Sequence, residues 1–301
     1  MSTSASAMRV SPDPARFWAG ELLRDGYCII PDLLPVAMIA ALHGDLKPRL
    51  AQTPFCEGNF FGCRTKRFGG LLKRSPHAAT LVQHPLILDV MQIVLGPWCD
   101  RFQLNLTQAI EIWNGELEQV PHRDQDMWRV ARGETEYLVN VMWPLTPFRE
   151  ENGATLLWPG THGSYAGPKP PRSAAVAAQM DPGAALLFLG STLHGGGGNR
   201  TEAPRTGMIA SYSLGWLRTY ENQFLVYPPE IARRFPPELA GLIGYQQHLP
   251  SLGNYEGQCP SIVLHGDVPD YVRFTDALRD EQVKPLAEYR ARLLASQKGT
   301  S

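Results

Sequence analysis

The feature that most limits the fold is a series of short apolar runs that glycine, proline and asparagine interrupt. Five of these runs lie between residues 101 and 217, at 101–113, 136–145, 153–160, 184–195 and 205–216. The chain of 301 residues contains 28 Gly and 26 Pro, which supply the breaks between them. Many short strands at close spacing predict an antiparallel barrel or jelly roll rather than a parallel α/β sheet. We therefore expect a mainly β fold with flanking helices, of the double-stranded β-helix (jelly-roll, cupin-like) class.

The regions on either side of this core are predicted to be largely helical. Residues 13–100 have helical periodicity, with a first helix that stops at Gly26 and a longer one over 80–97. Residues 218–301 mix helical patterns with Pro/Gly loops, and we expect them to pack on the barrel or to cover its mouth as a lid. Residues 1–12 are polar and rich in small side chains, which favours disorder.

Composition and charge exclude several classes of protein. The net charge is -1 and no basic block occurs, which argues against a nucleic-acid partner. No run of eighteen apolar residues predicts a membrane span. The five cysteines are scattered and form no C-x-x-C pair, so we expect free thiols in a reducing cytosol. No repeat or linker divides the chain, and we predict one cytoplasmic domain over residues 1–301.

The sequence His122-Arg123-Asp124 places two types of metal ligand two positions apart. In a strand, residues i and i+2 face the same side, so His122 and Asp124 would project together. A second His would complete a 2-His-1-carboxylate triad, which leaves three coordination positions open on Fe(II). Because an isolated H-x-D is also found in ordinary polar turns, the metal interpretation depends on finding this partner.

His194 is the best candidate for the second histidine ligand. It ends the apolar run 184–195 and precedes the glycines of the tract 195–198, where the backbone can approach a ligand closely. The alternative interpretation of this tract is a flexible hairpin loop; a phosphate-binding loop is not expected, because no G-K-[ST] follows. The remaining histidines lie in or beside predicted helices, in the C-terminal part or in a turn: His43, His77, His84, His248, His265 and His162.

Arg205 is a candidate anion clamp because it opens the run 205–216, eleven residues after His194. A guanidinium at the mouth of a barrel can hold a carboxylate through two parallel hydrogen bonds. A single Arg at the start of a strand is more often a solvated surface residue, and Arg200 in the glycine-rich loop is a rival clamp. We prefer Arg205, since a strand holds a side chain more rigidly than such a loop.

The ordered combination of these motifs resembles the phytanoyl-CoA dioxygenase family of Fe(II)/2-oxoglutarate oxygenases. The resemblance rests on "HRD" at 122–124, "NGATLLWPGTHG" at 152–163, "LHGGGGNRT" at 193–201 and Arg205. It covers most of the chain, residues 17–257, and is strongest toward fungal and bacterial members that oxidise secondary metabolites. The "PGSH" that is usual in the family stands here as "PGTH".

The resemblance implies specific roles for the site residues. It implies three ligands to Fe(II): His122, Asp124 and His194. It implies that Arg205 binds the distal carboxylate of the cosubstrate 2-oxoglutarate, that Gln119 and Thr161 also contact this cosubstrate, and that His162 is a structural turn residue. The reaction would consume O2 and release succinate and CO2. Related halogenases replace the carboxylate at position 124 by a small residue, so its presence here implies hydroxylation, desaturation or ring rearrangement.

The substrate is expected to be a small molecule that a mobile loop holds. Phe60, Phe61 and Arg67 lie in the glycine-rich segment 58–70, which is expected to fold over the barrel mouth, and segment 245–257 is a second candidate lid. No basic cluster suits a CoA diphosphate, so an acyl-CoA substrate is not expected. Two other hypotheses stay open: a cupin-type metal dioxygenase that does not use 2-oxoglutarate, and a non-catalytic barrel that only binds. Because relatives are often dimers, a homodimer is expected.

Overall fold

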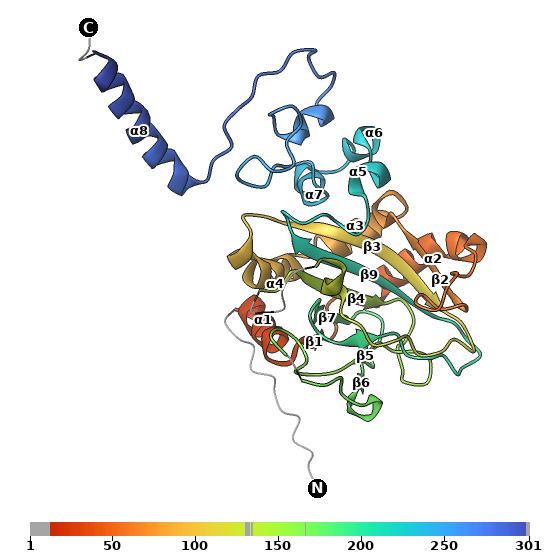
Figure 1. Ribbon diagram of the computed structural model, residues 1–301. Coiled ribbons are helices and arrows are strands. Elements are labelled where there is room, and N and C mark those ends of the chain that lie inside the picture. The colour runs from red at the N-terminus through yellow and green to blue at the C-terminus, as the bar shows by residue number, and fades with distance from the viewer. Residues whose placement is uncertain (1–12, 130–132, 134, 166, 299–301) are drawn as a thin grey trace. The chain divides into compact units, whose positions relative to one another are not determined.

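The computed structural model describes residues 13–129, 133, 135–165 and 167–298, so the predicted disorder of residues 1–12 falls outside the described part. The contacts divide the chain into two compact units, Met1–Tyr227 and Pro228–Ser301. All the strands among the described residues lie in the first unit (Figure 1). The interpretation of the chain as one domain in which residues 218–301 form a lid stays a prediction.

The larger sheet of the first unit has six antiparallel strands in the order β1-β7-β4-β9-β3-β2 (Figure 1). Its strands are β1 (Tyr27–Ile30), β2 (Thr65–Gly69), β3 (Phe102–Ile112), β4 (Leu138–Pro144), β7 (Ala185–Leu189) and β9 (Arg205–Leu214). The strands β4, β7 and β9 are buried along their whole length. Burial of both faces explains why β4 and β7 are nearly continuous apolar runs rather than alternating ones. β3 and β9 pair from Phe102 opposite Leu214 to Ile112 opposite Arg205, with one irregularity on the way.

The smaller sheet has three very short strands in the order β6-β5-β8. These are β5 (Leu156–Leu157), β6 (Val176–Ala177) and β8 (His194–Gly195). Apolar side chains from both sheets meet in one core cluster, which includes Leu157 from the smaller sheet and Met142 and Phe188 from the larger. Two antiparallel sheets packed on a shared apolar core agree with the predicted class of fold.

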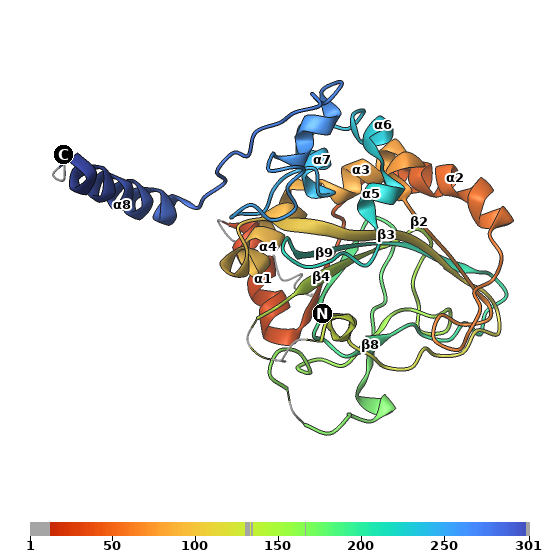
Figure 2. The same ribbon diagram turned by 45° about the horizontal axis from the view of Figure 1, so that its top comes forward.

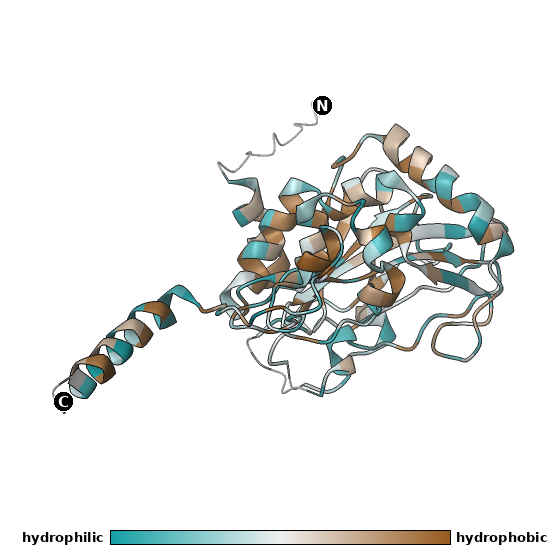
Figure 3. Ribbon diagram, turned by 90° about the horizontal axis from the view of Figure 1, so that it is seen from above, coloured by the Kyte–Doolittle hydropathy of each residue, from teal (hydrophilic) through white to brown (hydrophobic). Residues whose placement is uncertain are grey.

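The helices of the first unit precede and follow the strands. They are α1 (Pro14–Asp25), α2 (Val36–Gln52), α3 (Pro76–Val82), α4 (Pro85–Leu95) and α5 (Gln223–Val226), with short 3-10 helices at Leu71–Lys73, Gly96–Trp98, Asp124–Met127 and Arg172–Ala174. In Figures 1 and 2, α2, α3 and α4 lie over one face of the larger sheet. Figure 3 shows apolar and polar residues alternating along the helices, as expected for helices that bury one face.

Sequence signals fix the ends of the N-terminal helices. α1 ends at Gly26, whose φ of 82° is left-handed, as the sequence predicted. The prediction of a single helix over residues 80–97 is wrong, because Pro85 starts a new helix after α3 has ended at Val82. Proline has no N–H to continue a helical ladder, and it disfavours the helical conformation of the residue before it.

The second unit contains α6 (Pro229–Ala232), α7 (Pro237–Leu242), the 3-10 helix Pro260–Leu264 and α8 (Asp280–Lys298). Within the described ranges of the whole chain, no single helix has the length and apolarity to cross a membrane. The segments Pro76–Val82 and Pro85–Trp98 meet those criteria only when taken together, as a pair bent by 43°.

Candidate active site

His122 and His194, far apart in the sequence, are joined through their backbones. The N–H of each donates to the carbonyl of the other at 2.9 Å, as an isolated antiparallel bridge at the start of β8. In each ring, Nδ1 donates to a carbonyl two residues earlier: Val120 O at 2.9 Å for His122, and Thr192 O at 3.0 Å for His194. These bonds fix the Nδ1–H tautomer and leave the Nε2 lone pair of both rings available to a ligand.

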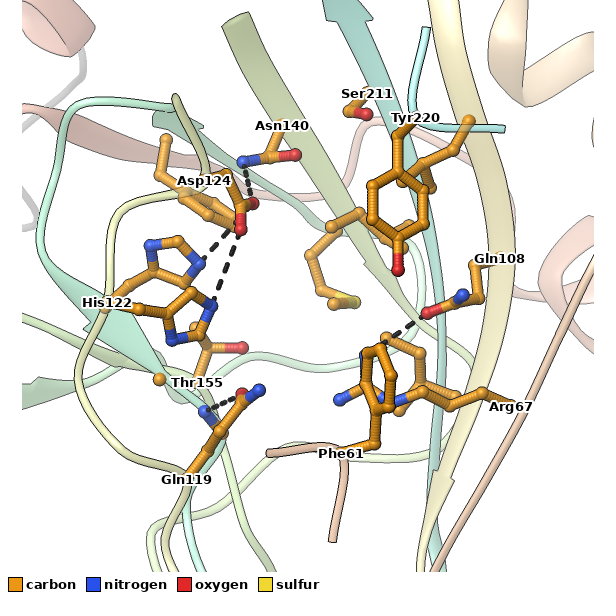
Figure 4. A pocket seen from close by; sticks show the side chains of 18 of the residues that line it. Phe61, Arg67, Gln108, Gln119, His122, Asp124, Asn140, Thr155, Ser211 and Tyr220 are labelled. Carbon is orange, nitrogen blue, oxygen red and sulfur yellow. Dashed lines mark hydrogen bonds and ion pairs between the residues drawn. The ribbon is translucent and has the colours of Figure 1, made fainter. Parts of the chain in front are cut away.

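Asp124 completes the group, although its backbone is not the predicted strand. It opens the 3-10 helix Asp124–Met127, so the strand argument for His122 and Asp124 is wrong in its geometry. The side chains nevertheless meet, with carboxylate oxygens 3.4 Å from His122 Nε2 and 3.5 Å from His194 Nε2 (Figure 4). Asn140 Nδ2, from β4, donates to the same carboxylate at 2.9 Å. One donor atom of each of the three residues lies within 4.8 Å of the others.

The protonation states of these groups suit a metal ion. Burial lowers the pKa of His194, which keeps its ring neutral at neutral pH. Burial acts to raise the pKa of Asp124, but the two imidazoles and the Asn140 amide outweigh it and lower the pKa to about 2. A neutral imidazole and an ionised carboxylate are the forms that bind metals. Two imidazole nitrogens and one carboxylate therefore fit a 2-His-1-carboxylate metal site.

A cavity of about 790 Å³, which includes space open to solvent, extends from the three residues. Its walls come from the segment 58–70 and from β3, β4 and β9, and Phe60 and Phe61 line it as predicted. His122 and Asp124 lie on one wall, whereas Arg67 and Gln108 lie on the opposite one (Figure 4).

Arg205, the first residue of β9, lines the same cavity and is 2% exposed. Its Nε donates to Gly153 O at 3.0 Å, its Nη2 donates to the same oxygen, and its guanidinium carbon is 4.1 Å from the centre of the Phe148 ring. Its Nη1 is buried and has no partner among the described residues. Burial lowers the pKa of Arg205 to about 9, and the nearby charge of Arg67 adds to this. A buried cation that keeps an unused donor is suited to binding an anion.

Arg67 is a second guanidinium in the cavity. It lies on β2 rather than in the loop before it, and it pairs with Ile110 of β3. Its Nη1 donates to Gln108 Oε1 at 3.2 Å, and its guanidinium carbon lies 5.3 Å from the centre of the Phe61 ring. Its Nε is buried without a partner among the described residues, and burial lowers its pKa.

Gln119 lies in the cavity, next to the metal ligands. Its Oε1 accepts from Gly196 N at 3.1 Å, and its Nε2 donates to Phe60 O at 3.0 Å. The Phe60 ring also contacts the His122 ring, with centres 4.9 Å apart. Gln119 therefore connects the segment 58–70 to the backbone beside His194.

Thr161 requires a correction, because the structure places it outside this cavity. Its hydroxyl donates to Trp158 O at 2.6 Å and accepts from Leu193 N at 3.0 Å, so both of its functions serve the backbone. The threonine that lines the cavity is Thr155, near Gln119 (Figure 4), and no described residue bonds its hydroxyl. Sequence reasoning missed Thr155, although it lies in the same quoted motif. His162 donates from Nε2 to Leu23 O at 2.9 Å, in agreement with a structural role.

The comparisons with known proteins identify the family. The family model described as "Phytanoyl-CoA dioxygenase (PhyH)" matches residues 22–207. The chain belongs to the phytanoyl-CoA dioxygenase family. Within this family, it is 30% identical over 237 residues to Dioxygenase aneA of Aspergillus aculeatus, which covers 72% of this chain and 78% of the relative. The resemblance stated from the motifs is confirmed, and the chain is a dioxygenase of the phytanoyl-CoA dioxygenase family.

Solved structures confirm the predicted fold of this family member. The non-heme alpha ketoglutarate dependent epimerase SnoN from nogalamycin biosynthesis aligns with a TM-score of 0.56 at 19% identity, over 68% of this chain and 84% of SnoN. HygX from Streptomyces hygroscopicus aligns with a TM-score of 0.54 at 14% identity, over 68% of this chain and 90% of HygX. The predicted jelly roll is therefore confirmed.

Proposed function

We propose that this phytanoyl-CoA dioxygenase family member is a non-haem Fe(II)- and 2-oxoglutarate-dependent dioxygenase that oxidises a small molecule and releases succinate and CO2. The observation that carries the proposal is the convergence of His122 Nε2, His194 Nε2 and the Asp124 carboxylate on one point at the cavity wall. Two structures with the same fold support it: SnoN was solved with Fe3+, alpha ketoglutarate and nogalamycin RO, and HygX with nickel, 2-oxoglutarate and hygromycin B.

His122, Asp124 and His194 would hold Fe(II), which together with 2-oxoglutarate and O2 supplies the oxidation of a C–H bond. The carbonyls of Val120 and Thr192 hold the two rings with Nε2 toward the metal position. By accepting the Nδ1–H hydrogen bonds, these carbonyls also make the Nε2 atoms more basic and therefore better electron-pair donors to the metal.

The two guanidinium groups form the anion site of this proposal. Arg205 binds the distal carboxylate of 2-oxoglutarate through its unused Nη1. Arg67 lies close enough for its charge to lower the pKa of Arg205, so an anion beside both would relieve their repulsion. Gln119 and Thr155 lie on the same side of the cavity as the metal ligands, where the other end of the cosubstrate would bind (Figure 4).

The outcome of the reaction is proposed to be hydroxylation, desaturation or rearrangement, because a carboxylate occupies the third ligand position. Asp124 keeps its carboxylate bonded to Asn140 and directed at both imidazoles, which leaves no place for a halide among the protein ligands.

The substrate is proposed to be a small, secondary-metabolite-like molecule. The homodimer and the cytoplasmic location stay predictions.

Anaerobic titration with Fe(II) and 2-oxoglutarate tests the proposal directly. The wild-type protein should develop a weak visible charge-transfer band, and His122→Ala and His194→Ala should not. His265→Ala, which removes an exposed histidine of the second unit, is the matched control and should keep the band. Absence of the band in the wild type would contradict the proposal. If the wild type forms the band, release of succinate in the presence of O2 would exclude the two other hypotheses: a cupin-type enzyme that does not use 2-oxoglutarate, and a barrel that only binds.

A further inference from the structure

The cavity wall opposite the metal ligands offers hydrogen-bond donors that nothing in the described chain uses. Gln108, from β3, and Tyr220, which follows β9, face His122 and Asp124 across the cavity (Figure 4). A substrate bound between the two walls would present one side to the metal and the other to Gln108 and Tyr220. The chemistry of these two side chains therefore bears on which substrates fit.

Arg67 fixes the orientation of the Gln108 amide. A guanidinium has donors and no acceptor, so the end of the amide that meets it must be the carbonyl oxygen. Arg67 Nη1 donates to Gln108 Oε1 at 3.2 Å. Nε2 is then the end left for the cavity, and no described residue accepts from it. A flipped amide would set its N–H groups against those of Arg67, so Gln108 offers the cavity a donor.

Tyr220 adds a second donor in the same part of the cavity. Its hydroxyl points toward the region of Gln108 (Figure 4), and no described residue bonds it. The backbone holds the residue in place, because Tyr220 N donates to Asn105 Oδ1 at 2.7 Å and Glu221 N donates to Asn105 O at 3.1 Å. Two donors on one wall are complementary to an acceptor oxygen.

The charges of the cavity select against a cationic substrate. Among the described residues that line it, the side chains with a full charge are Arg67, Asp124 and Arg205. Asp124 belongs to the metal group, so no carboxylate remains to pair with an ammonium ion. Burying an unpaired cation is costly. Apolar side chains such as Phe61, Leu138 and others make up much of the remaining wall.

We propose that Gln108 and Tyr220 recognise a carbonyl oxygen on an uncharged, mainly apolar substrate, such as a ketone, lactone or amide. Arg67 is the positioning residue that holds Gln108 as a donor. The inference rests on the proposed function and narrows its substrate class. According to this inference, the wall opposite the metal ligands determines which substrates bind.

Two probes with the same skeleton test this selectivity: 4-phenylcyclohexanone, which is neutral, and 4-phenylcyclohexylamine, which is a cation at neutral pH. Their binding to Zn(II)-loaded protein with saturating 2-oxoglutarate is measured by saturation-transfer NMR, so that no turnover is needed. The wild type should bind the ketone roughly tenfold or more tightly than the amine. Gln108→Leu should weaken ketone binding about fivefold, since one hydrogen bond is lost. Gln108→Glu should remove most of the preference for the ketone, because its carboxylate, held by Arg67, offers the cavity only acceptors.

Matched controls separate selectivity from general damage. The same substitutions at the exposed Gln52, Gln52→Leu and Gln52→Glu, should leave both affinities unchanged. Tyr220→Phe should weaken ketone binding a few-fold without favouring the amine. Failure of the ketone to bind the wild type, equal affinity for the two probes, or an unchanged preference in Gln108→Glu would overturn the inference. The NMR signals of 2-oxoglutarate in the same samples report its binding. If the wild type did not bind 2-oxoglutarate, the proposed function would be overturned, and this inference would be overturned with it.

Discussion

The two sheets position their parts of the site in different ways. In the larger sheet, Gln108 and Arg205 lie on β3 and β9, which pair along nearly their whole length. In the smaller sheet each strand has two residues, and a single bridge holds His122 against His194. The cavity wall and the anion site therefore depend on long strands with many redundant hydrogen bonds. The metal end depends on a few individual hydrogen bonds, so single substitutions there should have larger effects.

Side chains take the place of strand pairing at the metal end. Arg123 Nε donates to Ser191 O at 2.8 Å, and its Nη2 donates to Thr161 O at 3.0 Å. These bonds tie the turn that contains His122 to the segment before His194. Asn140, reaching from β4 to Asp124, is a link from the larger sheet to the metal ligands. The metal ligands are thus held by a small number of side-chain hydrogen bonds, and few other bonds could replace one that is lost.

The largest effect is expected when a metal ligand is removed. Zn(II) at about 100 times its Kd should stabilise the wild type by about 2.7 kcal/mol, since it binds only the folded state. Asp124→Ala should abolish this stabilisation, measured as a shift in Tm on adding Zn(II). Asp126→Ala, which removes an exposed carboxylate two residues later, should keep it. A metal-dependent Tm shift that survives in Asp124→Ala would show that the metal binds elsewhere.

Removing the cation of the larger sheet should affect the cosubstrate and spare the metal. Arg205→Ala should weaken 2-oxoglutarate binding by about 2–3 kcal/mol, or roughly 30- to 150-fold, because a charge-assisted hydrogen bond is lost. Metal affinity should change little, since Arg205 contacts Gly153 and Phe148 and none of the three ligands. Calorimetric titration of both ligands checks this. Arg200→Ala, the exposed rival, is the control; if it had the larger effect, the anion site would be assigned to the wrong arginine.

Much of the fold could be predicted because its signals are local. Gly26, which has a left-handed conformation, ends α1. The apolar runs predicted the longer strands β3, β4, β7 and β9. Pro85 is also a local signal, and it ends the helical run despite the apolar periodicity on either side of it. The two-residue strands of the smaller sheet could not be predicted from the run 153–160, since only tertiary pairing defines them.

The candidate site was predictable where one residue type meets one chemical need. His122, Asp124 and His194 were found from ligand chemistry, although Asp124 lies in a 3-10 helix instead of a strand. The function of Arg67 in orienting Gln108 could not be predicted, because it depends on the pairing of β2 with β3. Contacts between segments that are distant in the sequence leave no pattern in either segment alone.

Two threonines of the motif 152–163 are expected to have different functions. Thr161 supports the fold, whereas Thr155 contacts the cosubstrate. Thr161→Val should lower the free energy of unfolding by about 1–2 kcal/mol, because the buried Leu193 N–H loses its acceptor, and should leave the Kd of 2-oxoglutarate unchanged. Thr155→Val should do the reverse, with stability nearly unchanged and 2-oxoglutarate binding weakened about fivefold. Chemical denaturation and cosubstrate titration give the two quantities. Equal effects of both substitutions on cosubstrate binding would remove the distinction.

The smallest effect concerns a buried acid that supports the metal end. Glu136 is 4% exposed, and the Ser191 hydroxyl lies 2.8 Å from both of its oxygens. Burial raises the pKa of Glu136 from 4.5 to about 7, against the hydrogen bonds from Ser191, which lower it. The folded state therefore binds more protons than the unfolded state between these two values, so stability falls as the pH rises through this window and levels off above pH 7.

Glu136→Gln isolates this contribution, because glutamine keeps the shape and does not titrate. From pH 6 to pH 7, the wild type should lose about 1 kcal/mol of unfolding free energy relative to the variant, and this loss should level off over the next pH unit. Urea denaturation at a series of pH values measures it. A wild type that instead lost stability relative to the variant as the pH fell would mean that the carboxylate is stabilised as the ion. The metal end would then contain a buried charge beside Ser191, and its sensitivity to substitution would have an electrostatic cause in addition to its short strands.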